Sequence, residues 1–120
     1  MTDKRIALTT CGSEDEAARI AAALVERRVA ACVNIVPGLR SFYRWRGETH
    51  DDAEWLLVIK TDAARLDDLR AAIERLHSYD LPEFIALPIV AGSAGYLNWI
   101  GENLGSEPPS QSSSDDSAGR

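Results

Sequence analysis

The hydrophobic pattern of the chain changes period several times, and the order of these changes limits the possible folds more than any other feature. Apolar residues alternate over residues 6–11, which predicts a strand. Ser13 and Glu16 then form a capping box, and apolar residues recur at helical spacing to about Arg28, which predicts a helix. A second run at helical spacing follows Asp62, a plausible N-cap. Two helices are therefore expected among strand-like segments.

The middle of the chain predicts two or three extended segments. Residues 29–36 are apolar enough for a strand, and the Pro-Gly pair that follows indicates a turn or bulge. Residues 41–46 alternate again and are rich in aromatic side chains, as strands often are. Residues 47–52 are expected to form a turn, and the apolar run over residues 54–60 predicts the next strand.

The C-terminal third predicts a last strand, a short helix and a tail. Residues 84–90 read as a strand in which Pro88 indicates a bulge or an edge position. Ser93 is a candidate cap for a third helix that Gly105 ends. We expect one folded domain over residues 1–105 and a disordered tail over residues 106–120, which has no core formers.

The order of these elements predicts an α+β fold of the ferredoxin-like type, a βαββαβ sandwich with an extra C-terminal helix. Right-handed crossovers place the first strand in the middle of the sheet. Its two neighbours are then the strand over residues 54–60 and the strand over residues 84–90, both antiparallel to it.

Composition excludes several classes of protein. The net charge of −6 argues against a nucleic-acid binder that depends on a basic face. No apolar run approaches the roughly 18 residues of a membrane span, and the N-terminal residues show no signal-peptide pattern. Two cysteines in such a chain indicate free thiols in a reducing cytoplasm rather than a disulfide framework.

The loop after the second helix is the densest group of metal-binding or proton-active side chains. His77, Tyr79, Asp80 and Glu83 supply an imidazole, a phenol and two carboxylates, and Pro82 requires the helix to end before it. One interpretation is a polar loop in which His77 caps the helix and interacts with its dipole. The other is a binding site.

The predicted topology brings distant residues to one edge of the sheet. The first strand ends at Cys11, and both of its antiparallel neighbours begin at that same end. Cys11, Glu54, His77, Asp80 and Glu83 are therefore expected to gather there. A thiolate with an imidazole is a donor set that selects copper or zinc. The alternative is that the carboxylates are only solvated at the rim.

Other notable residues have a structural interpretation. Cys32 stands between apolar neighbours and is expected to be a small core residue. The aromatic side chains favour core packing and interface anchoring, with a stacked organic ligand as the alternative. They are Tyr43, Trp45, Trp55, Tyr79, Tyr96 and Trp99.

Five ordered motifs between about Arg5 and Leu104 resemble the CutA family, the divalent-cation tolerance proteins. In this chain the motifs read AACVNI at residues 30–35, SFYRWRG at 41–47, EWLL at 54–57 with Lys60-Thr61, HSYDLPE at 77–83, and YLNWI at 96–100.

The resemblance implies a ferredoxin-like subunit in a tight homotrimer, a cytoplasmic location, and a role in tolerance to copper and other divalent cations. The copper ligands proposed in the family fall on Cys11 and His77 of this chain. A second histidine of some relatives falls on Leu76, and a proline that usually follows the histidine is replaced by Ser78. The weaker candidates for a metal ligand are Glu54, Asp80 and Glu83.

Two functions therefore compete, and a third is not expected. The first is a trimeric protein that binds Cu²⁺ or a related divalent ion. The second is a small-ligand sensor resembling the PII signalling trimers, which the aromatic set and the acidic rim suggest. An enzyme is not expected, because no nucleophile–base set or phosphate loop is visible. The sequence names no protein partner beyond further copies of itself.

Overall fold

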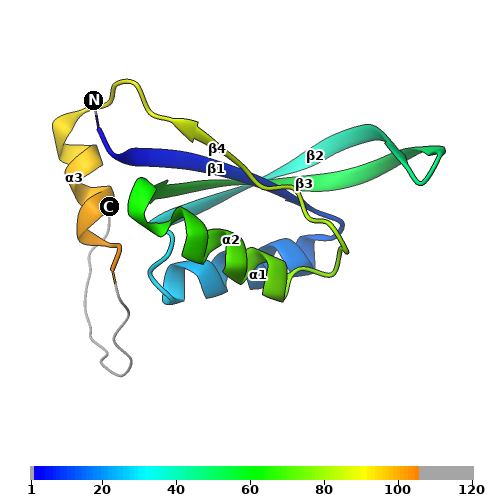
Figure 1. Cartoon of the computed structure of the whole chain (residues 1–120), viewed down its shortest axis with the longest axis horizontal. Helices are drawn as coiled ribbons and strands as arrows, with labels where there is room; N and C mark the ends of the chain where they lie inside the picture. Colours follow the sequence, from blue (N-terminus) through cyan, green and yellow to red (C-terminus); the bar gives the residue numbers. More distant parts are fainter. Residues whose placement is uncertain (1, 106–120) are drawn as a thin grey trace.

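In the computed structural model, which describes residues 2–105, the chain forms a four-stranded antiparallel sheet with helices packed on one face (Figure 1). The predicted tail over residues 106–120 lies outside the described residues, so that prediction stays untested. The elements of the described part are β1 (Lys4–Cys11), α1 (Glu14–Glu26), β2 (Cys32–Trp45), β3 (Glu48–Asp62), a 3₁₀ turn (Ala63–Arg65), α2 (Leu66–Leu76), β4 (Ile85–Pro88) and α3 (Ala94–Glu102).

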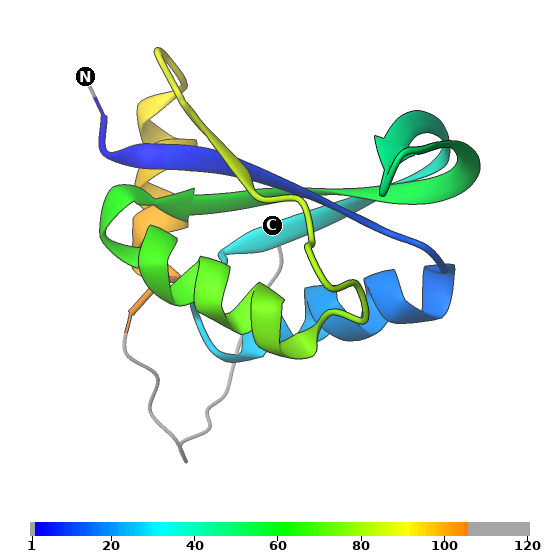
Figure 2. The ribbon, with the colours of Figure 1, turned by 45° about the vertical axis from the view of Figure 1, so that its right-hand side comes forward.

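The strand order β2-β3-β1-β4 confirms the predicted ferredoxin-like arrangement. β1 lies in the middle and pairs antiparallel with both β3 and β4. Pro88 belongs to β4, which is an edge strand, the position predicted for a residue that has no N–H to donate. Figures 1 and 2 show α1 and α2 side by side across one face of this sheet.

The core lies between these two helices and the sheet. The apolar faces predicted for α1 and α2 are the ones that become buried, and β3 supplies the opposing side chains. The largest fully buried side chains there are Ile20, Leu24, Leu57, Ile59, Leu69 and Ile73. All three predicted caps form: the Ser13 hydroxyl accepts from the Glu16 N–H at 3.1 Å, Asp62 accepts from the Arg65 N–H at 3.1 Å, and the Ser93 hydroxyl accepts from the Tyr96 N–H at 3.3 Å.

The β2–β3 hairpin is longer than the sequence predicts. β2 is continuous, with a register shift between Val36 and Leu39, and the turn predicted over residues 47–52 shrinks to Arg46 and Gly47. These two residues have φ values of 52° and 83°, the positive pair that a two-residue hairpin turn requires. The paired residues 39–54 form an arm that projects beyond the helices (Figure 1).

Side-chain pairs across the arm explain why its polar sequence is a strand and not a turn. The Arg40 guanidinium donates two hydrogen bonds of 2.9 Å to Asp51, and the Tyr43 ring stacks on His50 with centroids 5.1 Å apart. Cross-strand pairs of this kind stabilise a sheet without a buried face. The period-two apolar signal is absent over residues 48–52 because this part of the arm has little apolar core to cover.

The expectation that Cys32 is a small core residue is wrong. Val33 and Ile35 of β2 pack against the core, so the alternation of the strand turns Cys32 and Asn34 to the other face. Helices α1 and α2 do not cover that face in Figures 1 and 2, and the Cys32 side chain is only half-buried. The prediction failed because the apolar neighbours of Cys32 in the sequence do not indicate which face of an edge strand is covered.

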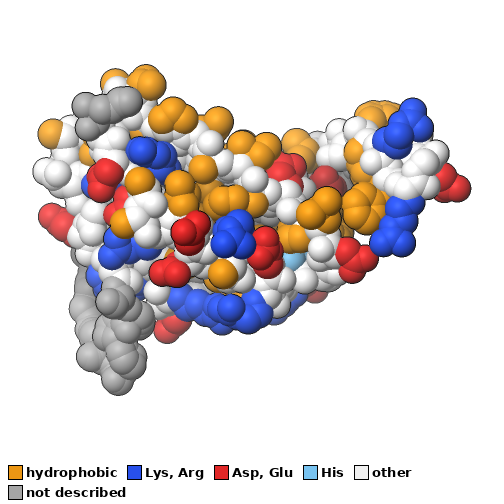
Figure 3. Space-filling model, in the orientation of Figure 1, with side chains coloured by type: hydrophobic (Ala, Val, Ile, Leu, Met, Phe, Trp, Pro, Cys, Tyr) orange, Lys and Arg blue, Asp and Glu red, His pale blue; other side chains and the backbone are white. Residues whose placement is uncertain are grey.

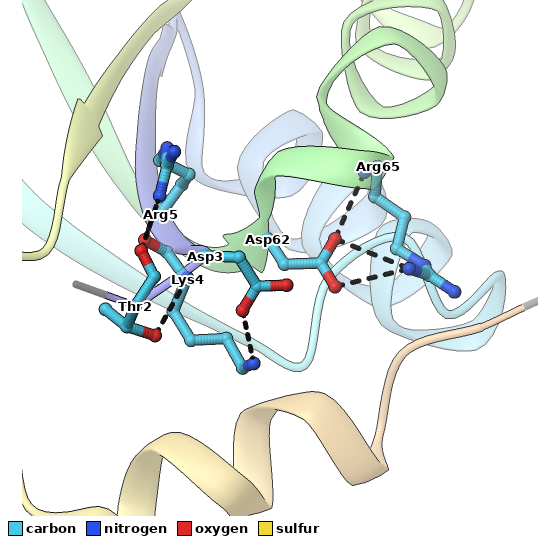
Figure 4. A network of polar contacts seen from close by, with 6 residues as sticks. All are labelled: Thr2, Asp3, Lys4, Arg5, Asp62 and Arg65. Atoms are coloured by element: carbon cyan, nitrogen blue, oxygen red, sulfur yellow. Dashed lines mark hydrogen bonds and ion pairs between the residues drawn. The ribbon is translucent and has the colours of Figure 1, made fainter.

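Helix α3 packs at the end of the sheet remote from the arm (Figure 1). Ile100 and Leu104 form a small second cluster with Ala31, and the Arg28 guanidinium donates to the carbonyls of Glu102 and Leu104 at 3.1 and 3.4 Å. Between this helix and the ends of the strands lie two ion pairs, Lys4–Asp3 at 2.7 Å and Arg65–Asp62 at 3.2 Å (Figure 4). Across residues 2–105, no helix is both long and apolar enough to span a bilayer.

Candidate metal centre and the adjacent groove

Three donors from separate elements meet beneath the sheet. Cys11 ends β1, Glu16 lies in the first turn of α1, and His77 follows the last residue of α2. One ligand atom from each lies within 4.8 Å of the other two, and all three residues are buried. Within the described part of the chain this is the one group of three or more Cys, His, Asp and Glu donors so close together. The topology therefore brings Cys11 and His77 together as predicted.

Glu16 is the member of this group that the sequence did not identify. Its expected role was to close the capping box on Ser13. Instead its Oε2 accepts a hydrogen bond of 2.8 Å from the Ser78 N–H and lies 3.6 Å from His77 Nδ1. A signal was present, because Glu16 precedes Ile20 and Leu24 at four-residue spacing and so shares the buried face of α1.

The charge on Glu16 is stabilised where it lies. Burial acts to raise the pKa of Glu16, but the hydrogen bond from Ser78 and the nearby Arg19 outweigh it and hold that pKa below its ordinary value. Glu16 is therefore a carboxylate at neutral pH, the form that binds a cation.

His77 is held by hydrogen bonds at both ring nitrogens. Nδ1 accepts from the Tyr79 N–H at 3.1 Å, and Nε2 lies 2.7 Å from the Thr10 carbonyl oxygen. These partners assign the proton to Nε2 and the Nδ1 lone pair to the bond from Tyr79, with the Glu16 carboxylate beside it. His77 is also the C-cap of α2, with its N–H donating to the Ile73 carbonyl at 2.9 Å. The capping interpretation is thus confirmed, and the ring lies beside two further donors.

Cys11 is fully buried and neutral in the absence of a bound ion. Burial, followed by the charges of Glu16 and Glu54, raises the pKa of the Cys11 thiol to about 12. A thiol must lose its proton to become a metal ligand. A positive ion at this position would reverse the electrostatic balance, because it would attract the thiolate that the two carboxylates disfavour.

The donor set fits a soft or borderline metal ion. A thiolate, an imidazole and a carboxylate are ligands of zinc and copper, and three protein ligands leave one position open in a tetrahedral site. Loading would require Cys11 to release its proton and His77 Nδ1 to exchange the Tyr79 N–H for the ion. Metal binding at this cluster is therefore expected to release protons and to shift the loop that carries Tyr79.

The carboxylates predicted as weaker ligands do not join this cluster. Cys11 faces the helices, whereas Glu54 lies on the opposite face of the sheet, where it accepts a 2.7 Å hydrogen bond from the Tyr79 hydroxyl. Asp80 is exposed and lies 3.6 Å from Arg46, and Glu83 is half-buried. The sheet separates Glu54 from Cys11 because Trp55 is the partner of Cys11 in β3, and adjacent residues of a strand point to opposite faces.

These three carboxylates instead line a groove of about 770 Å³ between the base of the arm and the loop before β4. The groove is walled by aromatic side chains: Phe42, Tyr43, Trp45, Tyr79 and Phe84. Burial, and then the bond to Glu54, raises the pKa of the Tyr79 phenol, which keeps it a hydrogen-bond donor. Three of the six aromatic residues singled out in the sequence lie here, and Tyr96 and Trp99 stack on α3 with centroids 5.5 Å apart.

Comparison with known proteins agrees with the resemblance in the motifs. The family model of the CutA1 divalent ion tolerance protein matches residues 5–103. The chain is 50% identical over 102 residues to the divalent-cation tolerance protein CutA of Thermus thermophilus. The matched region covers 85% of this chain and 99% of that protein.

Solved structures show the same fold. That of the divalent cation tolerance protein (Cut A1) from Thermus thermophilus has a TM-score of 0.83 at 50% identity, covering 85% of this chain and 99% of that one. That of CutA from Xylella fastidiosa has a TM-score of 0.84 at 36% identity, covering 87% and 100%. These matches lend no support to a PII-like sensor. The chain belongs to the CutA1 divalent ion tolerance family.

Proposed function

We propose that this protein contributes to divalent-cation tolerance by binding copper or a related divalent ion at Cys11, Glu16 and His77, in a binding role rather than a catalytic one. The observation that carries the proposal is the convergence of three different donor types within 4.8 Å. Cys11 supplies a soft thiolate, His77 supplies Nδ1, and Glu16 supplies negative charge. Glu16 takes the place of the carboxylate or water that two ligands alone would need.

The proposal includes a homotrimer in the cytoplasm. The arm and the open edges of β2 and β4 support assembly, because unpaired strand edges recruit further strands. The two free thiols support a reducing compartment. Cell fractionation of the native host tests the location, and recovery of the protein outside the cytoplasmic fraction would contradict it.

Calorimetric titration of the full chain with Cu²⁺, and separately with redox-inert Zn²⁺, tests the metal centre. Cys11→Ser, Glu16→Gln and His77→Ala should each weaken binding by at least about tenfold, since changes one step further from a metal already cost ~10–100-fold. Wild type should release protons on loading, seen as a dependence of the heat on the buffer's ionisation enthalpy.

The chain offers matched controls, because it holds two cysteines and two histidines. Cys32→Ser and His50→Ala change the other member of each pair and should bind as wild type does. Circular dichroism and sedimentation must show that every variant keeps its fold and assembly. Equal affinity in the test and control variants would place the metal elsewhere and overturn the assignment.

A further inference from the structure

The groove on the open face of the sheet is separate from the metal centre. None of Cys11, Glu16 and His77 lines it. It lies where the arm leaves the body, and Figure 3 shows hydrophobic and acidic side chains gathered at that junction. Its volume of about 770 Å³ falls in the range of small-molecule sites.

The charge of the groove is of one sign. Its lining includes the carboxylates of Glu54, Asp80 and Glu83 but no lysine, arginine or histidine. Arg46 lies 3.6 Å from Asp80, where both side chains are well exposed, so this ion pair stands at the rim. The charges of Glu54 and Glu83 therefore have no cationic partner among residues 2–105.

Both inner carboxylates are withdrawn from water. Glu54 is only 7% exposed, and its contact is the neutral Tyr79 hydroxyl, which leaves its charge uncompensated. Glu83 is half-buried and has no hydrogen-bond or ion-pair partner within the described ranges. A partly desolvated carboxylate without a partner is costly, and a cation in the groove would relieve that cost.

The walls indicate the kind of cation. Five aromatic rings surround the carboxylates, and aromatic faces attract cations and stack on flat apolar groups. A hard metal ion would need six or more oxygen ligands, whereas this lining is mainly apolar. We propose that the groove binds a small organic cation that carries a primary ammonium group on an apolar or aromatic body. The ammonium group lies between Glu54 and Glu83, and the body stacks against the aromatic wall.

The test is a titration of the full chain in its native assembly with 2-phenylethylamine, followed by calorimetry and by tryptophan fluorescence, to which Trp45 in the groove wall contributes. Its uncharged analogue 2-phenylethanol is the paired ligand. A chelator is present throughout, so failure of the metal proposal has no effect on this result. The amine should bind at least about tenfold more tightly than the alcohol.

Glu83→Gln keeps the shape of the side chain and should weaken amine binding by about tenfold while leaving alcohol binding unchanged. Glu54→Gln, which still accepts from Tyr79, should have the same effect. Glu26→Gln is the matched control, because Glu26 is exposed at the end of α1 and outside the groove. The proposal is overturned if amine and alcohol bind alike, if the groove variants match Glu26→Gln, or if the assembled protein binds no amine because another copy covers the groove.

Discussion

At the scale of single residues, the two cysteines have opposite environments. Cys11 is fully buried and burial raises its pKa to about 12, whereas Cys32 is half-buried on the open face. At pH 8, Ellman's reagent should modify one thiol per folded chain, Cys32, and should reach Cys11 only after unfolding. Folded Cys32→Ser should therefore show no reactive thiol. A rapidly reacting thiol in that variant would contradict the burial of Cys11.

The same shift has a consequence for stability at alkaline pH. The pKa of Cys11 is higher in the folded state than its ordinary value of 9.0. Its contribution to stability is thus complete below pH 9 and is lost as the pH rises toward about 12. At neutral pH the thiol therefore stays protonated unless a metal ion displaces its proton.

At the scale of elements, the turn of the arm depends on glycine. Gly47 has a φ of 83°, and a Cβ placed on it would touch nothing within 4 Å, so only the backbone conformation opposes a side chain. Gly47→Ala should lower the free energy of unfolding by ~1 kcal/mol, because left-handed backbone strains an L-residue. Gly95, in α3, also has open space but helical backbone. Gly95→Ala should raise the free energy of unfolding by up to ~1 kcal/mol. Urea denaturation at equal protein concentration measures both, and a shift of the same sign in the two variants would be inconsistent with this account.

At the scale of the whole molecule, the exposed apolar surface supports the proposed trimer. Val36 on edge strand β2 is 41% exposed, and Leu87 on edge strand β4 is 44% exposed. Such residues on unpaired edges are expected to be covered by other copies, and a cyclic arrangement closes the edges. Sedimentation at micromolar concentration should give one species of three times the 13.1 kDa subunit mass. Leu87→Asp should shift the distribution toward smaller species, whereas Arg75→Asp, in α2 on the other face, should not. A folded wild-type monomer at that concentration would refute the trimer.

Local patterns were sufficient to predict most of the fold. The period-two and 3.6 patterns, together with Ser13 and Asp62 as caps, define elements because they depend on short-range geometry. The central position of β1 followed from their order, since crossover handedness allows few alternatives. Local patterns did not predict the arm, because residues 48–52 are polar and form a strand only by pairing with β2.

The candidate site shows the same division between local and tertiary information. The sequence alone determined that a thiol at the end of β1 and an imidazole after α2 meet, because strand order brings those ends together. Which face of the sheet each side chain occupies was decided only by the tertiary structure. It placed Glu16 beside His77 and moved Glu54 and Glu83 to a groove on the opposite face. The physical reason is that a strand reverses the direction of its side chains at every residue, so the bulges, register and packing of the whole sheet determine which charges share a site.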